Sequence, residues 1–231
     1  MFLTECPRDA MQGWGEFIPT QKKIDYINAL MEVGFDVLDC GSFVSPKAIP
    51  QMADTAEVLR ALDLSDTKTR LSVIVANTRG AEEAAGFEQV NFMGYPFSIS
   101  ETFQVRNTNS TILQALDTVK QMQEICTTAN KEFVLYISMA FGNPYGDPWN
   151  IEVVEKWVDE MQKLGIESLT AGFVLMDKEE KNGLNYTPDP STKKIMSLPV
   201  IIPHNETIHM EQVVANWKKG VLASVWAKRM A

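Results

Sequence analysis

Short apolar runs alternate with longer amphipathic stretches along most of this chain, and this alternation is the feature that most constrains its fold. The predicted strands cover residues 1–4, 35–39, 71–76, 89–93, 133–138, 166–169 and, as a weaker candidate, 198–202. Strands that alternate with helices of about 10 to 15 residues are typical of parallel β/α units. The pattern therefore predicts an α/β protein built around a parallel sheet.

The helical stretches between these strands carry start and stop signals. Thr20 is expected to cap a helix that ends at Gly34, and Asn150 is expected to cap a helix that ends at Gly165. A third helix is predicted over residues 111–126. Apolar residues recur along each helix at a spacing of about 3.6 residues, which is typical of a face packed against a sheet. We interpret these stripes as core and not as cofactor-binding surfaces.

Two parallel architectures fit the alternation, a closed barrel and an open doubly wound sheet. The open sheet usually carries a glycine-rich phosphate loop after its first strand. Here that strand is followed by C-P-R-D, and neither GxGxxG nor GxxxxGK[ST] occurs in the sequence. The sequence therefore favours a parallel (β/α)8 TIM barrel. A usual barrel needs roughly 250 residues, so these 231 residues predict a barrel incomplete at its C-terminal end, with six to seven β/α units.

Charge and cysteine content exclude several classes of protein. The net charge of −9 argues against binding to nucleic acid or to acidic membrane surfaces, because both need a positive field. Three widely spaced cysteines without a CxxC pair argue against a disulfide framework or a zinc site. The sequence shows neither a signal peptide nor an apolar run near the roughly 18 residues of a membrane span. We therefore expect a cytoplasmic protein without nucleic-acid or membrane partners.

Polar residues follow the predicted strands, where the loops of a parallel barrel carry function. Arg8 and Asp9 follow the first strand, Asp39 and Ser42 the second, and Asn143 the fifth. An arginine beside a carboxylate is often a surface ion pair of little energetic consequence. At the end of a buried strand, however, Asp9 offers a hard oxygen ligand for Mg²⁺ or Mn²⁺, and Arg8 offers fixed donors for a developing oxyanion. Spacing alone leaves both interpretations open.

Four segments carry a family resemblance. Residues 5–12 read E-C-P-R-D-A-M-Q, residues 41–54 read G-S-F-V-S-P-K-A-I-P-Q-M-A-D, residues 100–109 read S-E-T-F-Q-V-R-N-T-N, and residues 142–145 read G-N-P-Y. They resemble the motifs V-G-P-R-D-G-L-Q, S-F-V-S-P-K-x-x-P-Q-M-x-D, S-E-x-F…N-x-N and G-C-P-Y of the 3-hydroxy-3-methylglutaryl-CoA lyases. That family comprises metal-dependent TIM-barrel lyases of the pyruvate carboxyltransferase-like superfamily. The resemblance covers residues 3–169, and the second segment is long enough to be specific.

The resemblance implies a retro-Claisen lyase that cleaves 3-hydroxy-3-methylglutaryl-CoA, an acyl-CoA, into acetyl-CoA and acetoacetate. Carried over by position, Asp9 would bind a divalent cation, Mg²⁺ or Mn²⁺, and Arg8 would neutralise the enolate oxygen. Gln12 would line the catalytic pocket beside Arg8. Ser42 and Asn143 would bind the substrate.

Asp39 is the third predicted catalytic residue, beside Arg8 and Gln12. It stands where the family commonly has a glutamate, so its carboxylate is one methylene closer to the backbone. Whether this shorter side chain reaches the site is left open by the sequence.

After residue 169 the resemblance ends. The family completes its metal site with a His-x-His pair, whereas this chain has only His204 and His209. His204 is the predicted second ligand, and a cation held by Asp9 and His204 would be weakly bound, because ligand number sets affinity. The S-L-x-D-T-x-G signature is begun but not completed, and no cysteine follows Cys126 to supply the family's G-G-C-P loop. We therefore divide the chain into a TIM-barrel lyase-like region at 1–169 and a divergent or truncated tail at 170–231, with a helix predicted at 210–219.

These losses leave a second hypothesis from another class of protein. The chain would then be a catalytically inactive homologue, truncated or frameshifted near residue 169, that acts at most as a binding or oligomerising module. An unclosed barrel leaves two sheet edges that invite pairing with another chain, which favours a homo-oligomer. A third option, an isopropylmalate-synthase-like or carboxyltransferase-like barrel, fits the S-F-V-S-P-K segment less well. Translating the other two frames after codon 169 would test the frameshift.

Overall fold

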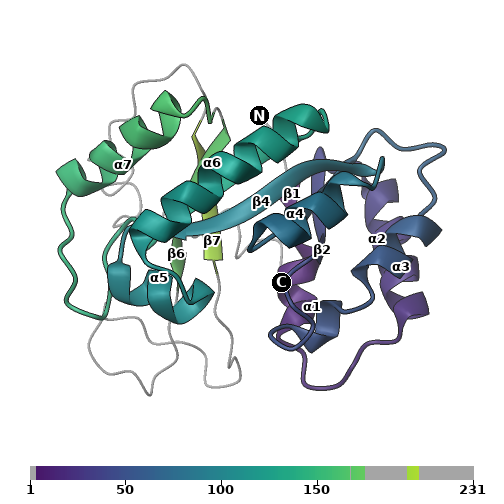
Figure 1. Cartoon of the computed structure of the whole chain (residues 1–231). Coiled ribbons are helices and arrows are strands. Elements are labelled where there is room, and N and C mark those ends of the chain that lie inside the picture. The colour runs from purple at the N-terminus through teal and green to yellow at the C-terminus, as the bar shows by residue number, and fades with distance from the viewer. Residues whose placement is uncertain (1–3, 167, 175–196, 203–231) are drawn as a thin grey trace.

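The computed structural model describes residues 4–166, 168–174 and 197–202 (Figure 1). Within these residues the strands form one seven-stranded sheet in the order β1 to β7. Each neighbouring pair from β1 to β6 is parallel, and the helices lie along the outside of the curled sheet (Figure 1). This curled parallel sheet with alternating helices agrees with the predicted barrel class.

Most predicted elements are present, with shifted boundaries. The strands are β1 (Thr4–Glu5), β2 (Val37–Ser42), β3 (Arg70–Ile74), β4 (Val90–Ser98), β5 (Glu132–Ser138), β6 (Ser168–Val174) and β7 (Ser197–Ile202). The helices are α1 (Pro7–Gln12), α2 (Thr20–Val33), α3 (Thr55–Ala61), α4 (Thr78–Ala85), α5 (Glu101–Thr108), α6 (Ile112–Thr128), α7 (Ile151–Lys163) and the 3₁₀ helix η1 (Pro50–Met52).

The ends of the long helices follow from local chemistry. Asn150 caps α7 as predicted, because its side chain accepts a hydrogen bond from the backbone N–H of Val153 at 2.8 Å. Gly34 ends α2 in the left-handed region, with φ at 82°. The prediction for Thr20 was wrong. The residue before the helix is Pro19, and the Thr20 hydroxyl instead donates to Asp54 Oδ2 at 2.8 Å, so it bonds to another element and not to its own helix.

The core lies between the sheet and the helices that cover it. Along β5, Phe133, Leu135 and Ile137 are buried, while the alternate residues Tyr136 and Ser138 are only half-buried. The predicted helix stripes pack onto this sheet, with these side chains buried: Ile24, Ile27 and Met31 of α2, and Val154 and Met161 of α7. Each such side chain contributes roughly 1.5–3 kcal/mol to folding. The stripes are core, as predicted.

Two strands differ from the prediction in length or direction. β4 runs on to Ser98 and includes Gly94 and Pro96, residues that usually interrupt strands. β7 pairs antiparallel with β6, so it does not continue the parallel β/α series. An antiparallel neighbour needs only a reversal of the chain, whereas a parallel one needs a crossover connection. Pro199 fits this position, because β7 pairs with β6 alone among the described strands.

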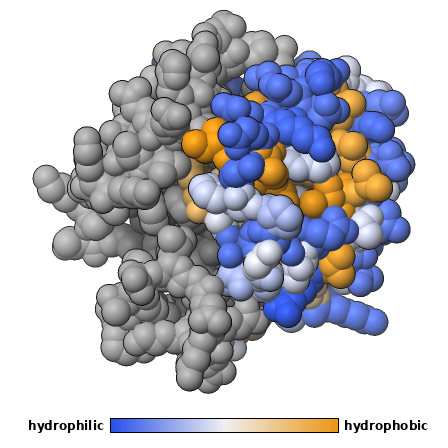
Figure 2. All heavy atoms as spheres, turned by 90° about the vertical axis from the view of Figure 1, so that its left-hand side faces the viewer, coloured by the Kyte–Doolittle hydropathy of each residue, from blue (hydrophilic) through white to orange (hydrophobic). Residues whose placement is uncertain are grey.

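Several predictions fall outside the described residues, namely His204, the helix at 210–219 and most of the tail at 170–231. Within the described part, no helix is long and apolar enough to cross a membrane. Figure 2 shows the side of the molecule that carries α7. There, polar side chains cover most of the described surface, and apolar residues form smaller patches between them.

Candidate active site

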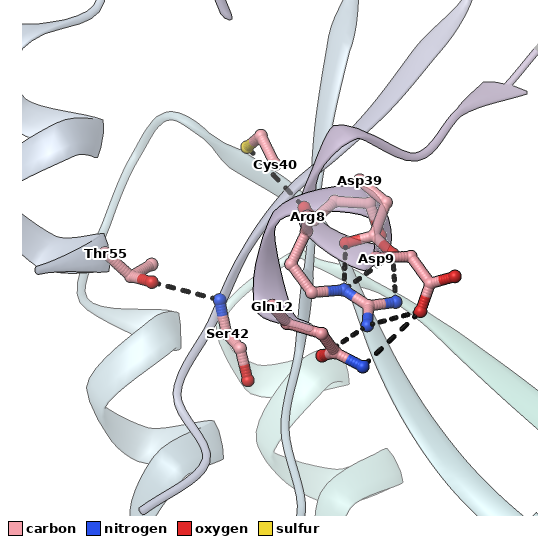
Figure 3. Close-up of polar contacts among 8 residues, drawn as sticks. Arg8, Asp9, Gln12, Asp39, Cys40, Ser42 and Thr55 are labelled. Atoms are coloured by element: carbon pink, nitrogen blue, oxygen red, sulfur yellow. Dashed lines mark hydrogen bonds and ion pairs between the residues drawn. The ribbon is translucent and has the colours of Figure 1, made fainter. Parts of the chain in front are cut away.

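Helix α1 positions three predicted site residues directly after β1. Pro7 is the first residue of this helix. The N–H groups of the first turn have no partner within a helix, so the N–H that proline lacks costs no helical hydrogen bond. Arg8 and Gln12 are four residues apart and therefore share one face. Arg8 Nη1 donates to Gln12 Oε1 at 2.8 Å (Figure 3). This helix was not predicted, although proline at the first position and the four-residue spacing were signals for it.

The guanidinium of Arg8 binds Asp39 of β2 along one edge. Nε lies 3.2 Å from Oδ1 and 3.1 Å from Oδ2, and Nη2 lies 2.6 Å from Oδ2 (Figure 3). The Asp39 side chain is 2% exposed and that of Arg8 is 12% exposed. The shorter carboxylate of Asp39 therefore reaches Arg8, and it holds the arginine in a largely buried pair of fixed orientation.

Asp9 lies on another side of the same guanidinium. Its Oδ1 accepts hydrogen bonds from Arg8 Nη1 at 3.3 Å and from Gln12 Nε2 at 3.4 Å. The Asp9 side chain is 26% exposed, in contrast to the enclosed Asp39. We call Arg8, Asp9, Gln12 and Asp39 the Arg8 cluster. It unites one cation, two carboxylates and one amide from α1 and β2.

The cluster keeps Arg8 charged. Burial by itself would lower the pKa of Arg8, but the charge of Asp39, its hydrogen bonds and the charge of Asp9 together raise that pKa above its ordinary value. The guanidinium is therefore a permanent cation whose donors are oriented by a buried carboxylate. Such a group can stabilise negative charge that develops on a nearby oxygen.

Tyr136 lies close to this cluster and was missed from the sequence. Its ring crosses the face of β4 at Gly94, where an added Cβ would lie 2.5 Å from Tyr136 Cε2. Burial and the nearby charge of Asp39 raise the pKa of the Tyr136 hydroxyl, and a hydrogen bond with Ser72 lowers it. The available signal was the alternation of β5, which places a polar aromatic residue on the face opposite the helices.

Ser42 and Asn143, the predicted substrate-binding residues, lie outside the Arg8 cluster. Ser42 Oγ accepts a hydrogen bond from Val44 N at 3.2 Å. Asn143 Oδ1 accepts from the backbone N–H groups of Tyr145 and Asp147, and its Nδ2 donates to the Asp147 carbonyl at 3.0 Å. Both side chains thus organise their own loops, and their contact with substrate stays a prediction.

Other polar residues at this end of the sheet bind loops and helix ends. Ser100 caps α5 by accepting from Phe103 N. The Asp147 carboxylate accepts from Ser100 Oγ at 2.5 Å, from Thr102 N at 2.9 Å and from Thr102 Oγ1 at 3.0 Å. Burial by itself would raise the pKa of Asp147, but these hydrogen bonds outweigh that effect and lower the pKa. We call Ser100, Thr102, Asn143 and Asp147 the Asp147 network.

Known proteins were compared with the chain by sequence and by structure. No family model matches it. The mitochondrial hydroxymethylglutaryl-CoA lyase of Mus musculus is 31% identical over 168 residues, which cover 72% of this chain and 50% of the relative. The crystal structure of the Bacillus subtilis HMG-CoA lyase superposes with a TM-score of 0.69 at 30% identity, covering 74% of this chain and 57% of that one.

The chain belongs to the hydroxymethylglutaryl-CoA lyase family.

Two further members of the lyase family extend the comparison. An HMG-CoA lyase from Acinetobacter baumannii, solved in complex with coenzyme A and 3-methylmalate, superposes with a TM-score of 0.68 at 31% identity and covers 74% of this chain and 56% of that one. The mitochondrial lyase of Arabidopsis thaliana is 33% identical over 226 residues, 95% of this chain and 45% of the relative. That alignment includes residues after position 169. This chain spans about half the length of the curated lyases it matches.

The described residues of this lyase homologue do not by themselves form the predicted cation site. Among residues 4–166, 168–174 and 197–202, no three His, Cys, Asp or Glu side chains lie close enough together to hold a metal ion. Asp9 Oδ1 is shared with Arg8 and Gln12, and Asp39 is paired with Arg8. The predicted second ligand, His204, lies outside the described residues. Asp9 as a metal ligand stays a prediction.

Proposed function

We propose that this chain is a carbon–carbon lyase that cleaves 3-hydroxy-3-methylglutaryl-CoA into acetyl-CoA and acetoacetate. The observation that carries the proposal is the Arg8 guanidinium, oriented by the buried Asp39 after the first strand of a lyase-family barrel. A coenzyme A complex of the Acinetobacter baumannii relative supports an acyl-CoA ligand.

Arg8 has a definite task in this reaction. When the tertiary hydroxyl of the substrate loses its proton, the C–C bond breaks, and the hydroxyl carbon becomes the ketone of acetoacetate. The electron pair of that bond moves to the thioester oxygen of the acetyl-CoA enolate, whose methylene carbon then takes up one proton to give acetyl-CoA. Arg8 donates one hydrogen bond to that oxygen from the second N–H of Nη2, because Nε and Nη1 donate to Asp39, Asp9 and Gln12. Fixed donors aimed at developing charge are worth several kcal/mol in a site closed to water.

Asp39 then acts through Arg8. Because the Arg8 guanidinium engages both of its carboxylate oxygens, Asp39 serves as a positioning residue and not as the base that deprotonates the substrate. Gln12 holds the opposite edge of the guanidinium by accepting from Nη1. The predicted roles of Arg8, Gln12 and Asp39 thus form one unit in which Arg8 contacts the reacting atoms.

A divalent cation, Mg²⁺ or Mn²⁺, stays part of the proposal through Asp9, the most exposed carboxylate of the Arg8 cluster. Of the two predicted ligands, Asp9 and His204, Asp9 alone lies among the described residues.

The remaining assignments complete the proposal. Residues 1–169 form the TIM-barrel lyase-like region, and 170–231 form a divergent or truncated tail. A homo-oligomer would cover the edge of the sheet at β1, which pairs with β2 alone among the described strands. A cytoplasmic location is compatible with three free cysteines, and the names of the relatives include both mitochondrial and cytoplasmic lyases.

The test is direct. The purified full chain is incubated with 3-hydroxy-3-methylglutaryl-CoA, with and without Mg²⁺ or Mn²⁺, and acetyl-CoA and acetoacetate are measured. Formation of acetyl-CoA and acetoacetate in equal amounts, at a rate higher than that of an Arg8→Gln variant, would support the proposal. Binding of coenzyme A in calorimetry without any cleavage would favour the inactive binding module instead.

A further inference from the structure

The segment Pro50–Asp54 belongs to the longest motif in the sequence, yet none of its residues enters the proposed chemistry. In the structure it forms η1 and the two residues that follow it. Gln51 is 5% exposed and the Asp54 side chain is 11% exposed, so both polar residues are largely enclosed. A buried polar side chain is held by hydrogen bonds, and its partners show what it positions.

The Gln51 side chain binds the loop that joins α1 to α2. Its Nε2 donates to the carbonyl of Trp14 at 3.3 Å and to the carbonyl of Glu16 at 2.8 Å. Its Oε1 accepts from the backbone N–H of Ile18 at 2.8 Å. One amide therefore fixes three backbone groups in a loop that starts immediately after Gln12.

Gln51 is itself held by the first turn of α2. Lys23 is 2% exposed, and its ammonium donates to the Gln51 carbonyl and to Asp54 Oδ1, the latter at 2.7 Å. Thr20 donates to the other oxygen of Asp54, and the ring centroid of Phe17 lies 4.1 Å from the ammonium. A buried ion pair often adds little net stability, so we assign the pair of Lys23 and Asp54 the role of fixing the position of Gln51.

The loop is continuous with the Arg8 cluster. The Trp14 N–H donates to the Met11 carbonyl at 2.9 Å, which closes the end of α1. α1 packs against η1 and β2, and the side chains of Met11 and Met52 are both buried. A shift of the loop would move Gln12, whose Oε1 accepts from Arg8 Nη1. The route from Gln51 to the guanidinium thus runs through the hydrogen bond to Trp14, the backbone from Trp14 to Gln12, and the hydrogen bond between Gln12 and Arg8.

We infer that Gln51 is a positioning residue for the Arg8 cluster, with Lys23 and Asp54 holding it in place. It locks the α1–α2 loop through three backbone hydrogen bonds and so fixes the helix that presents Arg8, Asp9 and Gln12. The consequence for catalysis rests on the proposed lyase function. The consequence for the order of the loop does not.

The first experiment measures backbone hydrogen exchange by mass spectrometry in the full chain. Gln51→Leu should speed exchange in residues 9–18 by about tenfold or more, while exchange in β3 stays at its wild-type rate. The matched control is Thr69→Val, which also removes a buried side-chain hydrogen bond to backbone, from Thr69 Oγ1 to the Phe35 carbonyl, before β3. It should leave residues 9–18 unchanged. Unchanged exchange there in Gln51→Leu, or an equal rise in β3, would overturn the inference.

The second experiment measures cleavage of 3-hydroxy-3-methylglutaryl-CoA. Gln51→Leu should lower kcat by about tenfold or more with little change in KM, because misplacement of a catalytic group acts on the transition state. Gln51→Glu keeps the acceptor for Ile18 N–H but sets a carboxylate oxygen against the carbonyls of Trp14 and Glu16, so its kcat should fall at least as far as that of Gln51→Leu. An active wild type with an unchanged kcat in Gln51→Leu would refute the positioning role. An inactive wild type would refute the proposed function, and the exchange experiment would still decide whether Gln51 orders the loop.

Discussion

Two polar networks lie after strands of the same parallel sheet, but they make different kinds of contact. The Arg8 cluster joins side chains to one another around a buried cation. The Asp147 network bonds largely to backbone, through the N–H groups of Thr102, Tyr145 and Asp147. Hydrogen bonds to backbone fix a loop, whereas a charged group oriented by other side chains is available for chemistry. Polar residues that follow a strand can therefore be assigned to a functional site only when their hydrogen-bond partners are known.

The largest effect on stability is expected at Asp39. Asp39→Ala should lower the free energy of unfolding by about 3–5 kcal/mol, because it leaves the Arg8 charge buried without its main partner. Urea unfolding of both proteins measures this. The double variant Arg8→Met with Asp39→Leu removes both charges and should recover most of the loss. A loss below about 1 kcal/mol in the single variant would show that the pair behaves as an exposed one.

The largest effect on activity is expected at Arg8. Arg8→Lys keeps the positive charge but loses the fork that binds both Asp39 oxygens, so kcat/KM for acyl-CoA cleavage should fall about 100-fold. Lys163→Ala is the control, because this exposed cation on α7 pairs only locally with Glu160. An unchanged kcat/KM in Arg8→Lys would show that a positive charge is sufficient and that the fixed fork of donors is not needed.

The Asp147 network should respond in stability more than in activity. Asp147→Asn is expected to cost about 1 kcal/mol at neutral pH and to change activity by at most a few-fold. The pKa of Asp147 is lowered in the folded protein, so its stabilising contribution is present above the unfolded pKa. It is lost as the pH falls through the folded pKa. Urea unfolding of wild type and variant should therefore converge in acid, and a constant difference at every pH would contradict this account.

The smallest effect is expected at Asn150, where the same loop enters α7. Asn150→Ala removes the cap on Val153 N and should cost about 1 kcal/mol or less with no change in turnover. Asn150→Asp retains a capping oxygen and should be near wild type. Thermal unfolding compares the three proteins. A loss of turnover in Asn150→Ala would place this loop closer to the chemistry than its contacts indicate.

Local signals in the sequence were sufficient to predict helix α7. The apolar stripe of α7 and its cap at Asn150 depend on neighbours in the chain, and both were predicted correctly. The strand β4 was predicted too short because Gly94 and Pro96 normally interrupt strands, whereas here Gly94 pairs with both β3 and β5, and Pro96 pairs with β5. Tertiary packing overrode local propensity at that point.

The candidate site was predicted in its residues but not in its contacts. Arg8, Asp9 and Gln12 stand close together in the sequence, and the motif identified them. The pairing of Arg8 with Asp39 spans 31 positions, and the reach of a shortened side chain depends on how two strands are placed. Gln51 was part of the same motif, but its three backbone partners lie more than 30 positions away. Such contacts follow from the fold and have no local sequence pattern.

The contact between Gly94 and Tyr136 makes these two positions interdependent. A methyl group at position 94 would overlap the tyrosine ring and also lie 2.8 Å from Ile74 Cδ1, so the two strands tolerate a larger residue only if the ring opposite is reduced. Across a set of homologous sequences, substitutions at 94 and 136 should therefore occur as compensating pairs. A larger residue at position 94 alone would push the phenol away from Ser72.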